Sequence, residues 1–450
     1  MIEIPPDRIA AVTGARILVE GNQAHPTRAS IDSRKVDPGD LFFGLPGEKT
    51  DGGEFAAGAL AAGAWGVVVS PDHAEGLASG EVDGWVFAAP DPLVALQDLA
   101  RDWRRSLGAR VLGITGSYGK TTVKDIARAL FPGEVHATEE NFNTEIGLPL
   151  TILSAPVGTD ILVLEMAMRG FGQIELLATI AEPEVGVITG VGPVHVELVG
   201  SVEGVARAKA ELIDGLPDDG VLVAPVQAGE LEPHIARAPA VIRFGEGGDV
   251  FLAESRREGD QTAALVSTPE GTERFEFPFT EAHNLMNALA AIGAGLALGV
   301  TLGSMSERTG QIRFSRLRGE RIRLGGGVLL LNDCYNANPV SMRSALEHLA
   351  SHSEASRRIA VLGLMGELGE DSDAYHAEVG RLARELGIET VIGVGPEAAQ
   401  YEPDSQASDP IEAAELLEGM LEPDSVILVK GSRSAGLEAV AEQLVEREGA

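Results

Sequence analysis

Cysteine is nearly absent from this chain, which has one, Cys334, among 450 residues. A single thiol excludes an internal disulfide framework and a multi-cysteine metal site, and it is typical of proteins in a reducing compartment. The N-terminal residues also lack the basic and apolar regions of a secretory signal peptide. We therefore expect a cytoplasmic protein.

Positive charge is scarce as well: 35 Lys and Arg residues stand against 68 Asp and Glu, a formal net charge of −33. This excess of negative charge repels phosphate backbones, so nonspecific nucleic-acid binding is disfavoured. Only six of the basic residues are lysines. A lysine retained in such a chain is a candidate for chemistry that a guanidinium cannot perform.

Only one long stretch could suggest a membrane span. Residues 285–306 carry no charge and contain the spacing Gly295-x-x-x-Gly299, which also occurs in paired transmembrane helices. Small residues supply much of its apolar character, Asn287 interrupts it, and Gly299 is a helix stop signal. We interpret the stretch as a buried helix and expect no integral membrane association.

The rest of the pattern predicts an α/β fold with three domains. Short strands and turns over residues 1–88 indicate a small α/β domain. Residues 89–312 alternate strands and helices in the manner of a parallel sheet. A second alternation over residues 313–450 indicates a Rossmann-like domain.

A glycine-rich loop joins an apolar strand to a helix at Gly113-Ile-Thr-Gly-Ser-Tyr-Gly-Lys-Thr-Thr122. Such a loop directs backbone N–H groups and the positive end of a helix dipole at phosphate. Lys120 can neutralise the β- and γ-phosphates, and Thr121 can bind Mg²⁺. Ile114 stands where the longer motif has its first Gly, so this is the shorter T-G-x-x-G-K-T form. The loop predicts a nucleoside triphosphate site.

Three residues farther along the chain extend this site. Glu165 ends a buried strand and either binds Mg²⁺, directly or through water, or caps the next helix. His195 follows the strand predicted at 185–189, at the sheet edge where α/β folds bind ligands, and is either a metal ligand or structural. Lys209 lies on a helix that also uses Arg207, which favours a role for an amine able to lose its proton.

Seven short motifs follow one another in the chain. They are Thr115-Gly-Ser-Tyr-Gly-Lys-Thr-Thr122, Asn141-Phe-Asn-Thr-Glu-Ile-Gly147, Glu165-Met-Ala-Met168, His195, Ala208-Lys-Ala-Glu211, His283-Asn-Leu-Met-Asn287 and Asp333-Cys-Tyr-Asn-Ala-Asn-Pro339. In this order the set resembles the Mur ligases of bacterial peptidoglycan synthesis, and the resemblance covers all three predicted domains.

Within that family, three segments resemble the ligase that performs the last addition. They are Tyr335-Asn-Ala-Asn-Pro339, Gly363-Leu-Met-Gly-Glu-Leu-Gly-Glu370 and Lys430-Gly-Ser-Arg-Ser434. The Asp-Asn-Pro-Arg motif of the diaminopimelate-adding ligases is absent. The resemblance implies a monomeric, ATP-dependent acid–D-amino-acid ligase that adds D-alanyl-D-alanine to UDP-N-acetylmuramoyl-tripeptide through an acyl phosphate.

The resemblance also implies a nucleotide site with two Mg²⁺ ions. The ATP phosphates would contact Thr115, Gly116, Ser117, Tyr118, Gly119, Lys120, Thr121 and Thr122. One Mg²⁺ would bind Thr121 and Glu165. A second would bind His195 and Lys209, the latter as a carbamate formed with CO₂. Lys120, His195 and Lys209 would thus be the catalytic residues.

Further roles follow from the same resemblance. Asn284 and Asn287 would hydrogen-bond adenine, and Arg318 and Asp333 would reach the nucleotide from the C-terminal domain. In the N-terminal domain, which would bind the UDP-substrate, the contacts would come from Ser33, Arg34 and Asp51. Asn143 and Thr144 would contact the muramoyl-peptide side.

Three positions depart from the family pattern, and several alternatives stay open. Ala167 and Leu317 each stand where a Gly is usual, and Gly53 replaces a His that commonly follows Asp-Gly. The two Asn residues of the His283 motif could bond across helices, and Asp333 could start a turn. The run ending at Pro339 could be a turn and helix start.

Other functions also remain open. A P-loop switch that binds partners would share the glycine loop. A diaminopimelate- or lysine-adding Mur ligase, or a ligase like folylpolyglutamate synthase, would share nearly all of the central site.

The charge balance yields the first testable prediction. Because 33 excess negative charges repel one another, added salt should screen the repulsion and stabilise the fold. We expect the melting temperature, measured by differential scanning calorimetry, to rise from low to moderate ionic strength. A fall over that range would mean that the acidic residues are already neutralised by pairing.

Overall fold

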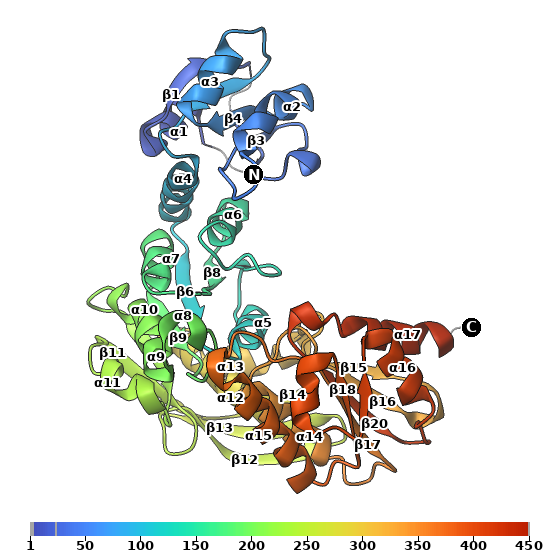
Figure 1. Cartoon of the computed structure of the whole chain (residues 1–450). Helices are drawn as coiled ribbons and strands as arrows, with labels where there is room; N and C mark the ends of the chain where they lie inside the picture. The colour runs from blue at the N-terminus through green and yellow to red at the C-terminus, as the bar shows by residue number, and fades with distance from the viewer. Residues whose placement is uncertain (1–3, 23–24, 449–450) are drawn as a thin grey trace.

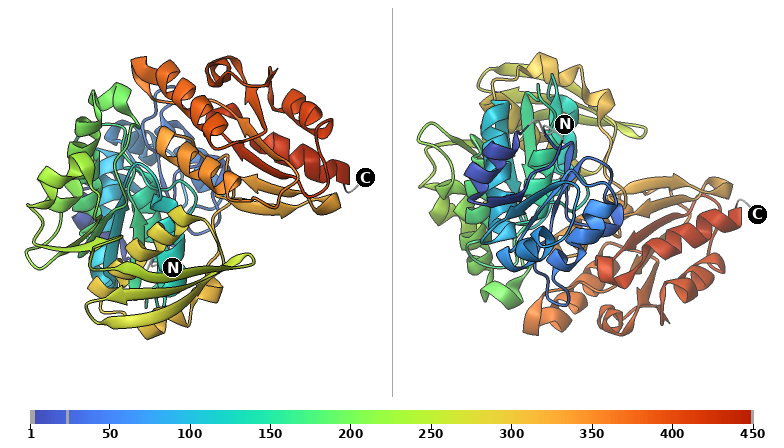
Figure 2. Two further views of the ribbon diagram at one scale, coloured as in Figure 1. Left: turned by 90° about the horizontal axis from the view of Figure 1, so that it is seen from below. Right: turned by 90° about the horizontal axis from the view of Figure 1, so that it is seen from above.

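The structure, a computed structural model, describes residues 4–22 and 25–448, which contain four β-sheets with helices packed on them. Figure 1 shows the blue N-terminal part at one end, the central part below it and the orange and red C-terminal part to one side. Seen from above, the N-terminal part lies over the central part, and the C-terminal part stays beside it (Figure 2). The predicted α/β fold class is confirmed for the described residues.

The N-terminal sheet has the strand order β1-β5-β4-β3-β2, with β1 antiparallel to β5 and the other pairs parallel. Its strands are β1 Arg16–Val19, β2 Arg28–Ser30, β3 Asp40–Phe43, β4 Gly66–Val69 and β5 Trp85–Ala88. Helices α2 (Ala56–Ala61) and α3 (Pro71–Ala78) cover one face. Helices α1 (Pro6–Thr13) and α4 (Pro92–Leu107) cover the other.

Helix α4 joins the N-terminal sheet to the central part. Asp91 caps its first turn by accepting N–H bonds from Leu93 and Val94, and Gly108 ends it in the left-handed conformation. Its apolar face, which includes Leu96, belongs to one hydrophobic cluster that continues into the central domain. The two parts therefore share a core through this helix.

The central sheet has six parallel strands in the order β11-β10-β9-β6-β8-β7. Its strands are β6 Arg110–Thr115, β7 Val135–Ala137, β8 Ile161–Glu165, β9 Val185–Ile188, β10 Val221–Pro225 and β11 Ala240–Phe244. From β6 the chain crosses to the edge strand β7, returns to β8 next to β6, and then runs outward on the other side through β9, β10 and β11. Ligands bind at such a switch point, outside the carboxyl ends of the strands.

Helices cover both faces of the central sheet. On one face lie α5 (Lys120–Leu130) and α12 (Ala282–Ala297), and on the other lie α4, α6 (Gly147–Ser154) and α7 (Gln173–Ala181). The shorter helices of this region are α8 Val196–Val199, α9 Val202–Lys209, α10 Glu211–Asp214, α11 Glu232–Ile235 and α13 Leu302–Ser306. The uncharged run at 285–306 is thus mainly the buried helix α12, and no helix in the described ranges is long and apolar enough to cross a membrane.

An antiparallel sheet of three strands was not predicted from the sequence: β12 Phe251–Glu258, β13 Gln261–Thr268 and β14 Gly271–Phe277. Thr262, Ala264 and Val266 of β13 are buried, whereas the residues between them are more exposed. This alternation of period two was the available signal. Phe275 and Phe277 stack and complete the core beside α12.

The C-terminal sheet has the order β15-β16-β20-β17-β18-β19, with only β15 antiparallel among these strands. Its strands are β15 Glu320–Arg323, β16 Leu329–Asn332, β17 Arg358–Leu362, β18 Thr390–Val394, β19 Ser405–Ala407 and β20 Val426–Lys430. Helices α14 (Pro339–Ala350) and α15 (Ser372–Glu385) pack on one face. Helices α16 (Pro410–Glu418) and α17 (Glu438–Glu448) lie on the other.

A buried ion pair fixes the segment that leads into the C-terminal domain. Lys124 and Asp125 of α5 are 3% and 7% exposed, and the Nζ and Oδ1 atoms lie 2.8 Å apart. Asp125 also accepts hydrogen bonds from the Ser315 amide at 2.8 Å and from its hydroxyl at 3.1 Å. The position of the connecting segment relative to α5 therefore depends on one carboxylate.

We expect Asp125→Ala to lower the free energy of unfolding by about 3–5 kcal/mol, because it leaves the Lys124 ammonium buried without its partner. Ser315→Ala, which removes the contacts of the hydroxyl with Asp125 and Lys124 but keeps the bond from the Ser315 amide to Asp125, should cost about 1 kcal/mol. Urea denaturation followed by circular dichroism measures both. Equal small losses in the two variants would show that Lys124 finds another partner and that the pair does not hold the segment.

Candidate functional site

The glycine-rich loop connects the end of β6 to the start of α5, at the switch point of the central sheet. Gly119 precedes the helix with a φ of 77°, and a Cβ there would collide with the side-chain oxygen of Asn287 on α12. The position therefore requires glycine on both counts. Lys120 Nζ donates to the Gly116 carbonyl at 2.8 Å, and burial lowers the pKa of Lys120 against the opposing charge of Glu165.

Glu165, at the end of β8, lies beside this loop. Its Oε2 accepts a hydrogen bond from the Thr121 hydroxyl at 2.8 Å, and its Oε1 accepts one from the Asn143 amide, also at 2.8 Å. Helix α7 begins after Gly172 without a side-chain cap, so the capping alternative for Glu165 is wrong. The carboxylate is held against the first turn of α5, the helix that follows the phosphate loop.

A cavity of about 550 Å³ opens above the loop. Its size is that of a small-molecule site, and both the central and the C-terminal domain supply its walls. The lining includes Ser117, Tyr118, Gly119, Lys120, Thr121, Thr122, Asn284, Asn287, Arg318, Asp333, Asn338 and Lys430. The two predicted Asn residues of α12 also contact each other, with Asn287 Nδ2 donating to Asn284 Oδ1 at 3.4 Å.

Arg318 reaches the cavity from the C-terminal side. Its guanidinium lies over the Tyr335 ring, 4.1 Å from the centroid, and its Nη2 donates to the Thr121 hydroxyl at 3.2 Å. Its Nε is buried and has no hydrogen-bond partner among the described residues. The cavity thus presents a cation with an unused donor beside the phosphate loop.

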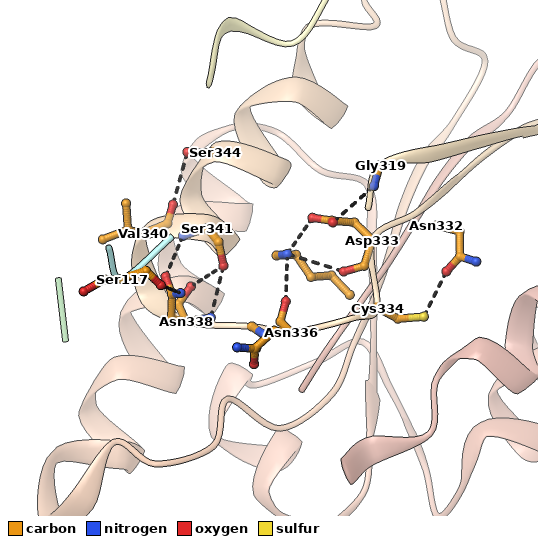
Figure 3. A network of polar contacts seen from close by, with 12 residues as sticks. Ser117, Gly319, Asn332, Asp333, Cys334, Asn336, Asn338, Val340, Ser341 and Ser344 are labelled. Atoms are coloured by element: carbon orange, nitrogen blue, oxygen red, sulfur yellow. Dashed lines mark hydrogen bonds and ion pairs between the residues drawn. The ribbon is translucent and has the colours of Figure 1, made fainter. Parts of the chain in front are cut away.

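Asp333 lines the cavity from the C-terminal domain, and Figure 3 shows the polar contacts of its carboxylate. One carboxylate oxygen accepts the Gly319 N–H at 3.2 Å, and the other lies 2.5 Å from Lys430 Nζ. Lys430 is 2% exposed and also donates to the Asn336 carbonyl at 3.1 Å. Asp333 therefore links three segments and does more than start a turn. Lys430 was missed as a site residue, although the rarity of lysine was a usable signal.

Asn338 both caps a helix and contacts the glycine loop, whereas the sequence left open which of these two roles it has. It caps α14 in a reciprocal pair of hydrogen bonds (Figure 3). The Asn338 side-chain oxygen accepts the Ser341 N–H at 2.9 Å, and the Ser341 hydroxyl accepts the Asn338 backbone N–H at 3.1 Å. The side-chain Nδ2 of Asn338 also donates to the Ser117 carbonyl of the glycine loop at 3.5 Å. The helix-start alternative is confirmed, and the same residue lines the cavity.

Lys209 ends α9 and is 1% exposed. Burial lowers its pKa well below the ordinary value, the charge of Lys120 lowers it further, and Glu165 opposes both. Lys209 therefore lies within electrostatic range of two residues of the phosphate site. A neutral amine is favoured at this position.

His195 precedes α8 and lies at the boundary with the C-terminal domain. Its Nδ1 is 2.5 Å from Oε2 of Glu367, a residue that the sequence analysis did not select for the site. No short-range pattern connects two residues so far apart in the chain.

The predicted substrate residues of the N-terminal domain lie on two short 3₁₀ turns. Ser33 and Arg34 belong to the first, where Asp32 binds the Arg34 guanidinium. Asp51 caps the second. Its pKa is lowered mainly by the hydrogen bond from the Gly53 backbone amide and, next in size, by the hydrogen bond with His73. Thr144 accepts the Gly147 N–H at 3.4 Å at the start of α6.

The structure explains two of the three departures from the family pattern. A Cβ at Gly53 would collide with the ring of His73, whose Nε2 lies 3.0 Å from Asp51. A histidine from α3 thus occupies the space beside Asp51. Leu317 has a φ of 62°, where glycine is preferred, but its side chain is buried in the C-terminal core. Nothing in the structure explains Ala167.

Comparisons with known proteins agree with this arrangement. Three family models match: the Mur ligase family, catalytic domain, over residues 26–104; the Mur ligase middle domain over 114–295; and the Mur ligase, glutamate ligase domain, over 317–433. A Bacillus subtilis (strain 168) protein named UDP-N-acetylmuramoyl-tripeptide–D-alanyl-D-alanine ligase is 35% identical, with 95% of this chain and 97% of that protein covered.

Two solved structures resemble the whole chain. MurF from Acinetobacter baumannii superposes with a TM-score of 0.89 at 28% identity and with 98% of both chains covered. MurF ligase from Thermotoga maritima in complex with ADP superposes with a TM-score of 0.82 at 29% identity, covering 93% of this chain and 96% of that one. With three matching family models and a relative 35% identical over nearly its full length, the chain belongs to the Mur ligase family.

Proposed function

We propose that this chain joins D-alanyl-D-alanine to the terminal carboxylate of UDP-N-acetylmuramoyl-tripeptide with the conversion of ATP to ADP and phosphate. The observation that carries the proposal is the two-domain cavity, in which a phosphate loop faces Arg318 and the Asp333–Lys430 pair. The B. subtilis relative is named for this reaction, and the T. maritima neighbour holds ADP.

The reaction proceeds in two steps. A carboxylate oxygen of the tripeptide attacks the γ-phosphorus of ATP, ADP leaves, and an acyl phosphate forms. The amine of D-alanyl-D-alanine then attacks the acyl carbon, loses a proton to a base, and displaces phosphate as the amide forms. The residues of the cavity mainly position the groups and neutralise charge.

Each wall of the cavity has a part in this scheme. The triphosphate binds to the loop residues Thr115 to Thr122, above all to Lys120. Asn284 and Asn287 bind adenine. Arg318 reaches the phosphates with its free Nε–H, while Asp333 fixes the position of Lys430. Because the walls belong to two domains, catalysis requires that both close on the nucleotide.

The residues beside the loop fit a magnesium ion. The Thr121 hydroxyl and the Glu165 carboxylate are hard oxygen donors in direct contact, which is the ligand type that Mg²⁺ prefers. The described residues contain no group of three His, Cys, Asp or Glu side chains that could hold a metal, so ATP phosphates and water must complete the coordination. Bound there, Mg²⁺ would offset the negative charge of the phosphates.

We further propose that Lys209 acts as a carbamate. Its burial and the nearby charge of Lys120 favour the neutral amine, which is the form that reacts with CO₂. The carbamate supplies an anionic oxygen that, with His195, would serve a second Mg²⁺. A free ammonium at this place would repel the metal.

The remaining assignments concern the domain limits, the residues that bind the UDP-substrate, and the cellular compartment. The domain limits 1–88, 89–312 and 313–450 correspond to the UDP-substrate, ATP-binding and C-terminal ligase domains. Ser33, Arg34 and Asp51 bind the UDP-sugar, and Asn143 and Thr144 lie on the path of the peptide toward the phosphates. The enzyme works in the cytoplasm, where its nucleotide-linked precursor and ATP occur.

We expect phosphate release only when ATP, Mg²⁺, UDP-N-acetylmuramoyl-tripeptide and D-alanyl-D-alanine are all present, because the amine must discharge the acyl phosphate. A coupled phosphate assay, with each component omitted in turn, tests this. Substantial turnover with the UDP-dipeptide and diaminopimelate or lysine would assign the preceding step instead. Turnover with a folate substrate would place the chain outside peptidoglycan synthesis.

Lys209→Ala should lose most of its activity, on the order of 100-fold, because the carbamate that would serve the second Mg²⁺ can no longer form. Short carboxylic acids such as acetate should restore part of it by occupying the space of the carbamate. Lys209→Arg should stay inactive with acetate, since its side chain fills that space and forms no carbamate.

A matched control is Arg207→Lys, an exposed position on the same helix, which should keep normal activity. Full activity in Lys209→Arg would rule out the carbamate, whatever acetate does to Lys209→Ala. Phosphate release under saturating substrates is the measurement for all three variants.

A further inference from the structure

Glu367 makes a contact with the site that the proposed reaction leaves unexplained. It lies in the loop that follows β17 of the C-terminal sheet, whereas His195 follows β9 of the central sheet. Their Oε2 and Nδ1 atoms are 2.5 Å apart, and His195 Nδ1 is buried without any other polar partner in the described chain. One carboxylate from the neighbouring domain thus faces a buried ring nitrogen.

Both residues adopt a backbone conformation that side chains disfavour. His195 has a φ of 54° and Glu367 a φ of 63°. Backbone strain of this kind concentrates at functional sites when the surroundings enforce it. The two strained residues meet across the boundary between two domains, which makes a chance contact on a relaxed surface a poor explanation.

Hydrogen bonds from the C-terminal domain fix the loop that carries Glu367. His376, which is 1% exposed, accepts the Met365 N–H at its Nε2 at 3.0 Å, and its Nδ1 donates to the Ser372 carbonyl at 2.7 Å. The Ser432 hydroxyl accepts the Gly366 N–H at 2.9 Å. The Glu367 carboxylate therefore projects from a rigid support, as positioning of another side chain requires.

The same loop also packs on the segment that carries His195. The 3₁₀ turn Gly369–Asp371 contacts α8, the helix that starts directly after His195. Contact between Glu367 and His195 consequently depends on docking of the C-terminal domain. If that domain moves away, the ring nitrogen loses its carboxylate.

From this geometry we infer that Glu367 is a positioning residue for His195: it fixes the ring proton on Nδ1 and leaves the Nε2 lone pair available to the catalytic site. The carboxylate is an acceptor only, so the proton of a neutral imidazole is favoured on the nitrogen that faces it. Because Glu367 comes from the C-terminal domain, His195 acquires its working orientation only when the two domains are docked. The inference uses the proposed function only in its kinetic test.

The two atoms are close, but their geometry is not that of a well-aligned hydrogen bond. Such contacts in ligand-free sites commonly tighten when substrates bind. We therefore expect the effect on His195 to be strongest with ADP and Mg²⁺ present.

Three variants of the full chain test the inference. Glu367→Ala removes the acceptor, Glu367→Gln keeps an oxygen acceptor without charge, and Glu370→Ala is the control, because Glu370 is an exposed acid three residues away on the same loop. Alanine, like glutamate, has a Cβ, so the backbone strain at position 367 is retained in the first variant.

The direct readout is the tautomer of His195 in ¹⁵N-histidine NMR, with the signal assigned by its loss in His195→Gln. Wild type, Glu367→Gln and Glu370→Ala with ADP and Mg²⁺ should show the proton on Nδ1. Glu367→Ala should show a mixture or the Nε2–H form. An unchanged Nδ1–H signal in Glu367→Ala would overturn the inference.

Kinetics provide the second readout. Glu367→Ala should lower kcat about 10–100-fold, with the KM for D-alanyl-D-alanine changed less than about twofold, and Glu367→Gln should recover most of the loss. A large rise in that KM with an unchanged tautomer would mean that Glu367 binds the amine substrate and would refute the positioning role. If wild type released no phosphate, the proposed function would fail, yet the NMR result would still decide the role of Glu367.

Discussion

The hydroxyl group of Thr121 is the point on which the arrangement of this site depends. It donates to Glu165 at the end of β8 and accepts a bond from Arg318 of the C-terminal side. The start of helix α5, the carboxyl end of strand β8 and a residue of the C-terminal domain therefore meet at one oxygen atom. The cavity exists because these three elements converge there, and the same convergence brings together the hydroxyl and the carboxylate that we propose as ligands of Mg²⁺.

Lysines are rare in this chain, and three of the six are buried. Lys124, Lys209 and Lys430 are 3%, 1% and 2% exposed, and Lys120 extends into the phosphate loop. A buried ammonium is costly unless it is paired, neutral or ready to bind an anion. Lys124 and Lys430 are paired with Asp125 and Asp333, whereas Lys120 and Lys209 have no carboxylate within ion-pair distance among the described residues and are the two amines that we propose for the chemistry.

Local departures from the family pattern are offset by neighbours that lie elsewhere in the sequence. Gly53 leaves room for His73, which reaches Asp51 from α3. Leu317 accepts an unfavourable φ, and burial of its side chain in the C-terminal core offsets the cost. The chemical group needed at a place can thus come from another element, provided that the fold brings it there.

The sequence by itself determined the α/β class, the phosphate loop and the buried nature of α12, because strand and helix periodicity and glycine-loop chemistry are local properties. It also marked Glu165 and Lys209, since a strand end and a retained lysine are visible without coordinates. The exposed sheet of β12–β14 was missed although its alternation was present. Only the tertiary structure decided that Lys430 supports Asp333 and that Glu367 faces His195. The residues of each pair are separated by 97 and 172 positions, and only the packing of domains and the order of strands in a sheet bring such residues together.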